Sequence, residues 1–122
     1  MSYMLLIIEP TTQRATRTEA QGREAYASMQ RFAQSLAAQG KLKAVESLSS
    51  QTTAVRVSRA AGQVELLDGP FAEAKEMVGG FFLLQNVTRD EAIALAQACP
   101  ASEWCTVEVR ALAPCFDDSH AA

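Results

Sequence analysis

The chain has 122 residues, of which 48% are hydrophobic and 20% are charged, and its formal net charge at pH 7 is −3. This length and composition are typical of one globular domain and argue against a disordered or fibrous chain. The lysines and arginines are scattered along the sequence. We therefore expect no direct contact with nucleic acid, which needs a clustered basic surface.

The apolar segment Tyr3–Ile8 predicts a buried first strand. It stops after about six apolar positions, whereas a membrane span needs about 18 or more. It also lacks the basic leader and small-residue cleavage site of a signal peptide. Pro10 is expected to end the strand because it has no N–H and disfavours further pairing. We expect no membrane association.

A long helix is predicted after a polar loop. Thr18 and Gln21 have the spacing of a capping box, and Gly40 is the expected C′ residue at the other end. Between them runs an apolar stripe of helical period, made of Ala25, Met29, Phe32 and Leu36.

The remaining elements follow in chain order. They are a strand at 42–49, a hairpin formed by 53–58 and 64–67, a dense apolar strand at 80–85, a helix that opens with a capping box at Thr88 and Glu91 and ends at Cys99, and a last strand at 104–112. This order predicts an α+β fold, a ferredoxin-like split βαβ arrangement with an antiparallel sheet. We expect one domain over residues 1–113 and a C-terminal tail over 114–122.

The apolar strand at 80–85 predicts a homodimer. Phe81 and Leu83 point to one side of the sheet, while Phe82 and Leu84 point to the other. Two helices cover only one face, and each exposed Phe or Leu would cost roughly 1.5–3 kcal/mol. We therefore expect the second face to meet the same face of another copy, giving a dimeric α+β barrel.

Cysteine and histidine usage argues against several kinds of site. The three cysteines, Cys99, Cys105 and Cys115, are an odd set without CxxC spacing, which favours free thiols in a reducing cytoplasm. The same spacing supports no zinc site. The one histidine, His120, lies in the tail, so a Ser-His-Asp or Cys-His site has no base. Since phosphate-binding glycine motifs are also absent, we expect neither a metal nor a cofactor.

The middle of the chain carries a recognisable motif. Asp68–Phe71 reads Asp-Gly-Pro-Phe, and it is followed by Glu73, Lys75, Glu76 and the pair Gly79–Gly80 at the start of the apolar strand. This segment resembles the signature of the DGPF, or YCII-related, family. The resemblance implies ferredoxin-like subunits packed sheet to sheet.

The resemblance also implies where a site would lie. Asp68 and Lys75 are the expected catalytic residues: Asp68 would move a proton, and Lys75 would bind an anionic group. Phe71, Glu73 and Glu76 are expected to bind the ligand. Some members of the wider superfamily resemble muconolactone isomerases. A few are assigned to the breakdown of lactones or chlorinated aromatics, with a histidine and an acidic residue proposed to act together. This chain has no internal histidine, so a carboxylate or lysine would have to serve as the base.

Other residues are candidates from their position alone. Glu9 ends the first strand and is expected to lie near the same pocket mouth as a ligand-binding residue. Tyr26, Met29 and Trp104 are candidates for a pocket lining, although apolar residues at such spacing more often form core. The glycine pair would let a ligand or another backbone approach closely.

Three functions stay open. The first is a small cytoplasmic enzyme or binding protein that acts on a small anionic or carbonyl-bearing molecule in an intersubunit pocket. The second, implied by the resemblance, is a non-catalytic regulatory or partner-binding module linked to an extracytoplasmic-function sigma factor. The third is purely structural: Asp68–Phe71 forms a turn that organises the dimer.

Overall fold

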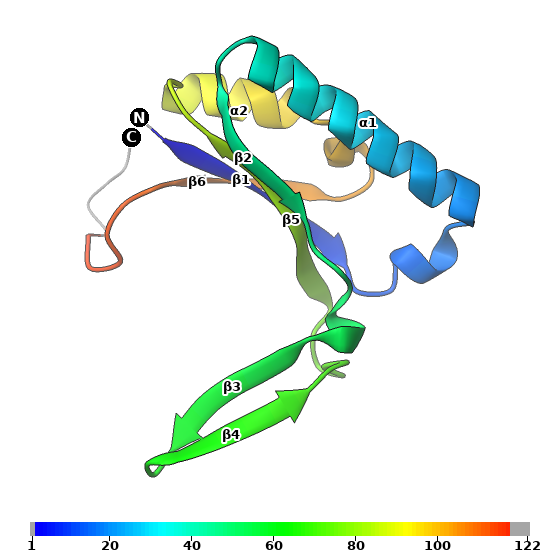
Figure 1. The fold of residues 1–122 in the computed structure, drawn as a ribbon, viewed down its shortest axis with the longest axis vertical. Helices are drawn as coiled ribbons and strands as arrows, with labels where there is room; N and C mark the ends of the chain where they lie inside the picture. The colour runs from blue at the N-terminus through cyan, green and yellow to red at the C-terminus, as the bar shows by residue number, and fades with distance from the viewer. Residues whose placement is uncertain (1, 118–122) are drawn as a thin grey trace.

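Four antiparallel strands form the main sheet, and two helices lie on one of its faces (Figure 1). The computed structural model describes residues 2–117. The elements of the main body are β1 (Tyr3–Pro10), α1 (Glu19–Ala38), β2 (Leu42–Ser47), β5 (Glu76–Leu84), α2 (Arg89–Ala98) and β6 (Thr106–Ala111). The strand order β2-β5-β1-β6 is a ferredoxin-like arrangement, so the predicted α+β fold is confirmed.

The core lies between the sheet and the helices. Leu5 of β1 and Phe82 and Leu84 of β5 are buried on the helix side, together with Leu36 of α1. Phe32 of α1 meets Phe82 edge to face, with ring centroids 5.2 Å apart. Of the two alternating sets of side chains in β5, Phe82 and Leu84 are therefore the set that points to the helices.

The opposite face of the sheet has no helix over it (Figure 1). It carries the other residues of the same alternation, which are Met4, Leu6 and Ile8 of β1 and Phe81 and Leu83 of β5. We call these five residues the bare sheet face. The homodimer that would cover it stays a prediction.

Both predicted helix starts are confirmed. The Thr18 side chain accepts a hydrogen bond from the Gln21 N–H while the Gln21 side chain accepts one from the Thr18 N–H, and Thr88 and Glu91 repeat this box at α2. Gly40 follows α1 with φ of +71°, as a C′ glycine does.

Most strand boundaries differ from the prediction by a few residues, and β5 begins four residues early, at Glu76. Two of the differences, at the end of β1 and at the start of β6, have a local cause. β1 extends through Pro10, which pairs with Glu76 as the last residue of the ladder and whose carbonyl accepts from the Gln13 N–H. Proline is tolerated there because no further donor is needed beyond the strand end. β6 begins at Thr106, two residues late, because the short helix η3 (Pro100–Glu103) ends in a turn that includes Trp104.

A hairpin stands apart from the main sheet. It consists of β3 (Val55–Ala60) and β4 (Gln63–Asp68), which pair only with each other. The turn residues Ala61 and Gly62 both have positive φ, at 51° and 79°, which matches a two-residue hairpin turn. The hairpin projects from the body on the side away from the helices (Figure 1).

Within residues 2–117, no helix has the length and apolar character required to cross a membrane. His120 and most of the predicted tail lie outside the described residues. The cytoplasmic location stays a prediction.

Candidate functional site

A cavity of about 620 Å³ lies between α1 and the helix-covered face of the sheet. Its apolar lining comes from four elements and a turn, and includes Ile7, Tyr26, Met29, Val45, Phe82 and Trp104. Ionisable residues also line it, including Glu9, Arg14 and Arg17. The volume is within the range of small-molecule sites. Tyr26, Met29 and Trp104, the lining candidates from the sequence, all contribute.

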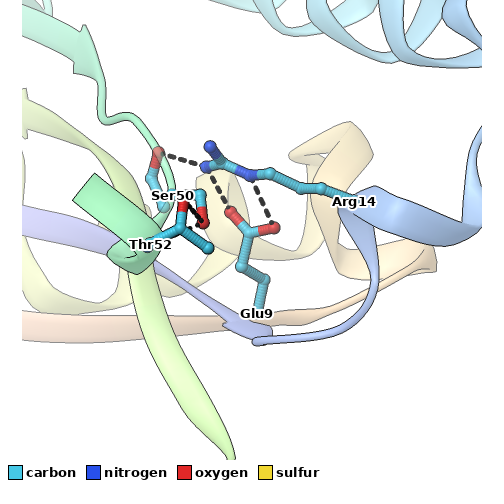
Figure 2. Close-up of polar contacts among 5 residues, drawn as sticks. Glu9, Arg14, Ser50 and Thr52 are labelled. Atoms are coloured by element: carbon cyan, nitrogen blue, oxygen red, sulfur yellow. Dashed lines mark hydrogen bonds and ion pairs between the residues drawn. The ribbon is translucent and has the colours of Figure 1, made fainter. Parts of the chain in front are cut away.

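An ion pair between a buried carboxylate and a partly exposed arginine lies at this cavity (Figure 2). Arg14, in the short helix η1 (Arg14–Thr16) just after β1, donates from Nη2 to Glu9 Oε1 at 2.7 Å and from Nε to Oε2 at 3.2 Å. Glu9 is only 6% exposed. A two-point contact of this kind holds the carboxylate in one orientation and offsets its desolvation.

Gly79 makes room for this pair. The β1–β5 register shifts between Ile7 and Ile8, so β5 bulges at Gly79. A Cβ built on Gly79 would overlap the Glu9 carboxylate and lie 3.1 Å from Arg14 Nη2. The Gly79 carbonyl accepts from Arg14 Nη2 at 3.4 Å and from the Leu48 N–H at 2.9 Å.

The second glycine has a similar structural reason. A Cβ on Gly80 would come within 2.8 Å of the Glu46 carbonyl on β2. The glycine pair therefore permits close approach, as the sequence suggested. The groups that approach are a carboxylate and a neighbouring strand.

Arg17 is the cation of the cavity without a carboxylate partner. Its guanidinium lies over the Trp104 ring, 5.6 Å from the centroid, and no ion pair joins it to another residue in the 2–117 range. The Trp104 carbonyl accepts from Gln13 Nε2 at 2.6 Å, which fixes the turn that carries the ring. The site thus offers a guanidinium with unused donors beside an aromatic face.

Cys105 also lines the cavity, but its thiol is poorly suited to act as a nucleophile. Burial raises the pKa of Cys105 from 9.0 to about 11, and the Glu9 charge adds to this while Arg17 opposes it. The reactive form of cysteine is the thiolate. The raised pKa keeps Cys105 protonated near neutral pH.

Hydrogen bonds from Thr11, the residue after β1, hold the segment that follows the Asp68–Phe71 turn, and backbone contacts at Gly69 hold the turn itself. The Thr11 N–H donates to the Lys75 carbonyl at 3.0 Å, and Thr11 Oγ1 donates to the Ala74 carbonyl at 3.3 Å. The Gly69 N–H donates to the Ala54 carbonyl at 2.7 Å, and a Cβ on Gly69 would overlap the Gln51 carbonyl. These contacts give the turn a structural role.

The predicted site residues do not gather in one place. Asp68, Glu73, Lys75 and Glu76 are exposed, and none of them lines the cavity. Phe71 is buried at 8% exposure with the Arg56 guanidinium 3.9 Å above its ring, and it does not line the cavity either. Glu9 is the one predicted site residue that does. The catalytic roles of Asp68 and Lys75 and the ligand-binding roles of Phe71, Glu73 and Glu76 stay predictions.

Sequence reasoning missed Arg14 and Arg17. Both lie in the polar loop between the first strand and the long helix, where no periodicity marks them. The available signal was positional: two arginines close in sequence to an acidic residue at a strand end. Among residues 2–117, no group of three or more potential metal ligands (His, Cys, Asp or Glu) lies together.

Comparison with known proteins identifies a family and a relative. The family described as YCII-related domain matches residues 1–115. An uncharacterised protein of Rhizobium meliloti (strain 1021) is 41% identical over 58 residues, which cover 48% of this chain. The matched stretch spans 47% of that relative's length, about half of it.

Proposed function

The chain belongs to the YCII-related family, and from this premise we propose that the cavity under α1 binds a small molecule with an apolar body and a carboxylate. The observation that carries the proposal is Arg17, an arginine without a carboxylate partner within the described chain, beside an apolar cavity of about 620 Å³. This refines the anionic ligand expected from the sequence. The proposed site differs in place from the one expected from the sequence. This cavity lies within one subunit, whereas the predicted intersubunit pocket would lie on the bare sheet face.

Arg17 suits a carboxylate better than a neutral group. A guanidinium presents paired donors that match the two oxygens of a carboxylate. Trp104 holds one face of the guanidinium and leaves its edge donors available. A charged hydrogen bond of this type contributes about 1.5–3 kcal/mol.

The apolar lining suits the body of the ligand. Ile7, Met29, Val45 and Phe82 offer hydrocarbon and aromatic contacts, and the Trp104 ring offers a flat one. Burying such a body gains roughly 25 cal/mol per Å². An aromatic or branched aliphatic carboxylate combines this gain with the contact to Arg17.

Glu9 is the candidate for chemistry at this site. Arg14 holds its carboxylate in a fixed orientation at the cavity. A carboxylate so placed can accept a proton from an acidic C–H or O–H of the bound molecule, with Arg14 stabilising the charge before transfer. Asp68 and Lys75 are the alternative acid–base pair, at the exposed turn between β4 and β5.

A thermal-shift screen of small carboxylates, lactones and chlorinated aromatics tests the proposal. A carboxylate at 100 times its Kd should stabilise the protein by roughly 2.7 kcal/mol. The matching amide, which lacks the charge, should shift the melting temperature much less.

Variants then locate the binding site of any hit. Arg17→Gln should weaken carboxylate binding at least about tenfold. Arg31→Gln is the matched control, because Arg31 lies on α1 but is 62% exposed and paired with Glu24. If Asp68→Asn and Lys75→Ala abolish binding while Arg17→Gln does not, the site lies at the turn and the proposal for the cavity is wrong.

The regulatory alternative has one observation in its favour. A partner-binding module needs an exposed apolar surface away from the ligand site, and the β3–β4 hairpin provides one. A link to an extracytoplasmic-function sigma factor would require this surface to bind a different protein.

A further inference from the structure

One nitrogen of the Arg14 guanidinium has no partner within the described chain. Nε donates to Glu9 Oε2, and Nη2 donates to Glu9 Oε1 and to the Gly79 carbonyl. Nη1 carries further N–H donors and makes no hydrogen bond to any residue between 2 and 117. Figure 2 shows Nη1 on the side of the guanidinium turned away from Glu9. Because the Arg14 side chain is 33% exposed and lines the cavity, these donors are available to a bound molecule.

Arg14 and Arg17 face the same cavity from one turn. The Arg17 N–H donates to the Arg14 carbonyl at 3.3 Å and closes the short helix η1. In a helix of this kind, side chains three residues apart lie one above the other, and both arginines line the cavity. The Cys105 thiol is a common neighbour: burial raises its pKa most, and the charges of Glu9 and Arg17 also act on it. One small molecule can therefore reach both guanidinium groups.

The charges at the Arg14–Glu9 pair determine which kind of group fits at Nη1. The pair is neutral as a whole, so a second carboxylate there would gain little from Arg14 and would be repelled by Glu9. A carbonyl oxygen avoids this repulsion. It accepts hydrogen bonds and brings no donor that would need a partner of its own. The carboxylate of the ligand belongs instead at Arg17, which has no ion pair within residues 2–117.

We propose that the cavity binds an oxo acid, a carboxylate that also carries a ketone, whose ketone oxygen accepts from Arg14 Nη1 while its carboxylate binds Arg17. This inference rests on the proposed function and narrows its ligand from carboxylates in general to one class. Arg14 then has two roles, which separate nitrogens fulfil: Nε and Nη2 hold Glu9, and Nη1 binds the ligand.

Acids that share one carbon skeleton test the ketone contact by isothermal titration calorimetry. Phenylbutyrate has the phenyl group and the carboxylate alone, while benzylpyruvate and benzoylpropionate add a ketone at different positions. At least one of these two oxo acids should bind at least about tenfold tighter than phenylbutyrate. Phenylsuccinate, which has a second carboxylate and no ketone, should bind no tighter than phenylbutyrate.

Arg14→Lys tests whether Nη1 makes the contact. Lysine keeps a cation beside Glu9 but has a single side-chain nitrogen, so the advantage of the oxo acid should disappear while phenylbutyrate binds as it does to wild type. Arg31→Lys is the matched control and should keep the advantage, because Arg31 is exposed and paired with Glu24. Thermal denaturation checks that Arg14→Lys is folded. If it is not, the comparison of the acids on the wild-type protein still tests the proposal.

The possible failures are distinguishable. If phenylbutyrate binds through Arg17 and neither oxo acid binds tighter, the oxo acid is wrong and the proposed function stands. Tightest binding of phenylsuccinate, or a ketone advantage that survives in Arg14→Lys, would also overturn the contact at Nη1. If none of the acids binds, or if all bind equally well to Arg17→Gln, the proposed function itself is contradicted, and the oxo acid with it.

Discussion

Gly79 lets a charged side chain lie directly against the sheet. Its missing Cβ leaves the space that the Glu9 carboxylate occupies, and its carbonyl receives Arg14. Its φ is not in the left-handed region, so steric room is the reason for glycine here. The identity of this residue therefore follows from the ion pair that lies beside it.

Gly79→Ala should destabilise the protein by about 1–3 kcal/mol, because the new methyl group must displace Glu9 from Arg14 or distort the bulge. Urea denaturation measures the change. Gly22→Ala on α1 is the matched control: nothing lies within 4 Å of its added Cβ, and alanine is the better helix former by roughly 0.5–1 kcal/mol. Equal stability of the two variants would contradict the packing described for Gly79.

Cys105 should react slowly with thiol reagents near neutral pH. Its pKa of about 11, raised mainly by burial and then by Glu9, makes its thiolate fraction at pH 8 about 100-fold lower than that of an unperturbed thiol. The rate at which Cys105 reacts should rise as the pH approaches 11. Cys115 is exposed and serves as the internal reference.

Peptide mass spectrometry after timed labelling resolves the cysteines. Glu9→Gln should speed Cys105 labelling and Arg17→Gln should slow it, because Glu9 raises and Arg17 lowers this pKa. Labelling of Cys105 at the rate of Cys115 would place the thiol outside the cavity.

At the scale of elements, local signals predicted the helices well. A capping box is complete within four residues, so Thr18 with Gln21 and Thr88 with Glu91 marked both starts correctly. The start of β5 was missed because Glu76 is charged and becomes a strand residue only through pairing with Pro10. Such pairing depends on residues far apart in the chain.

The second capping box makes a pH-dependent contribution to stability. Hydrogen bonds from the Thr88 backbone and side chain, together with Lys41, hold the pKa of Glu91 below 4.5. A lowered folded-state pKa stabilises the native state above the unfolded pKa, and this is lost as the pH falls through the folded value. Glu91→Gln should therefore lower the melting temperature at pH 7, and the difference from wild type should shrink as the pH falls below 4.5.

Calorimetry across this pH range checks the expectation. Glu103→Gln is the control, because Glu103 is exposed and no hydrogen bond or ion pair joins its side chain to the rest of the 2–117 segment. A difference for Glu91→Gln that is constant from pH 7 to below 4.5 would mean that the carboxylate charge adds nothing to the cap.

At the scale of the whole molecule, the two faces of the sheet have different roles. The helix side holds the core and the cavity, while the other side is apolar and bare. The sequence predicted this division because the alternation of Phe81 to Leu84 is a local pattern. It named the lining residues Tyr26, Met29 and Trp104, but it did not predict where the cavity lies. Glu9, Arg17 and Trp104 come together only through the packing of α1 and η3 on the sheet.

Trp104 provides the most direct measurement of the ligand site, because it is the only tryptophan of the chain and lies in the cavity under Arg17. The measurement is a fluorescence titration with the best carboxylate from the screen, beside its amide. We predict that the carboxylate gives a saturable change in Trp104 emission. Its dissociation constant should be at least about tenfold higher in Arg17→Gln and unchanged in Arg31→Gln. A carboxylate that binds without altering Trp104 emission, or equally well without Arg17, would contradict a site in this cavity.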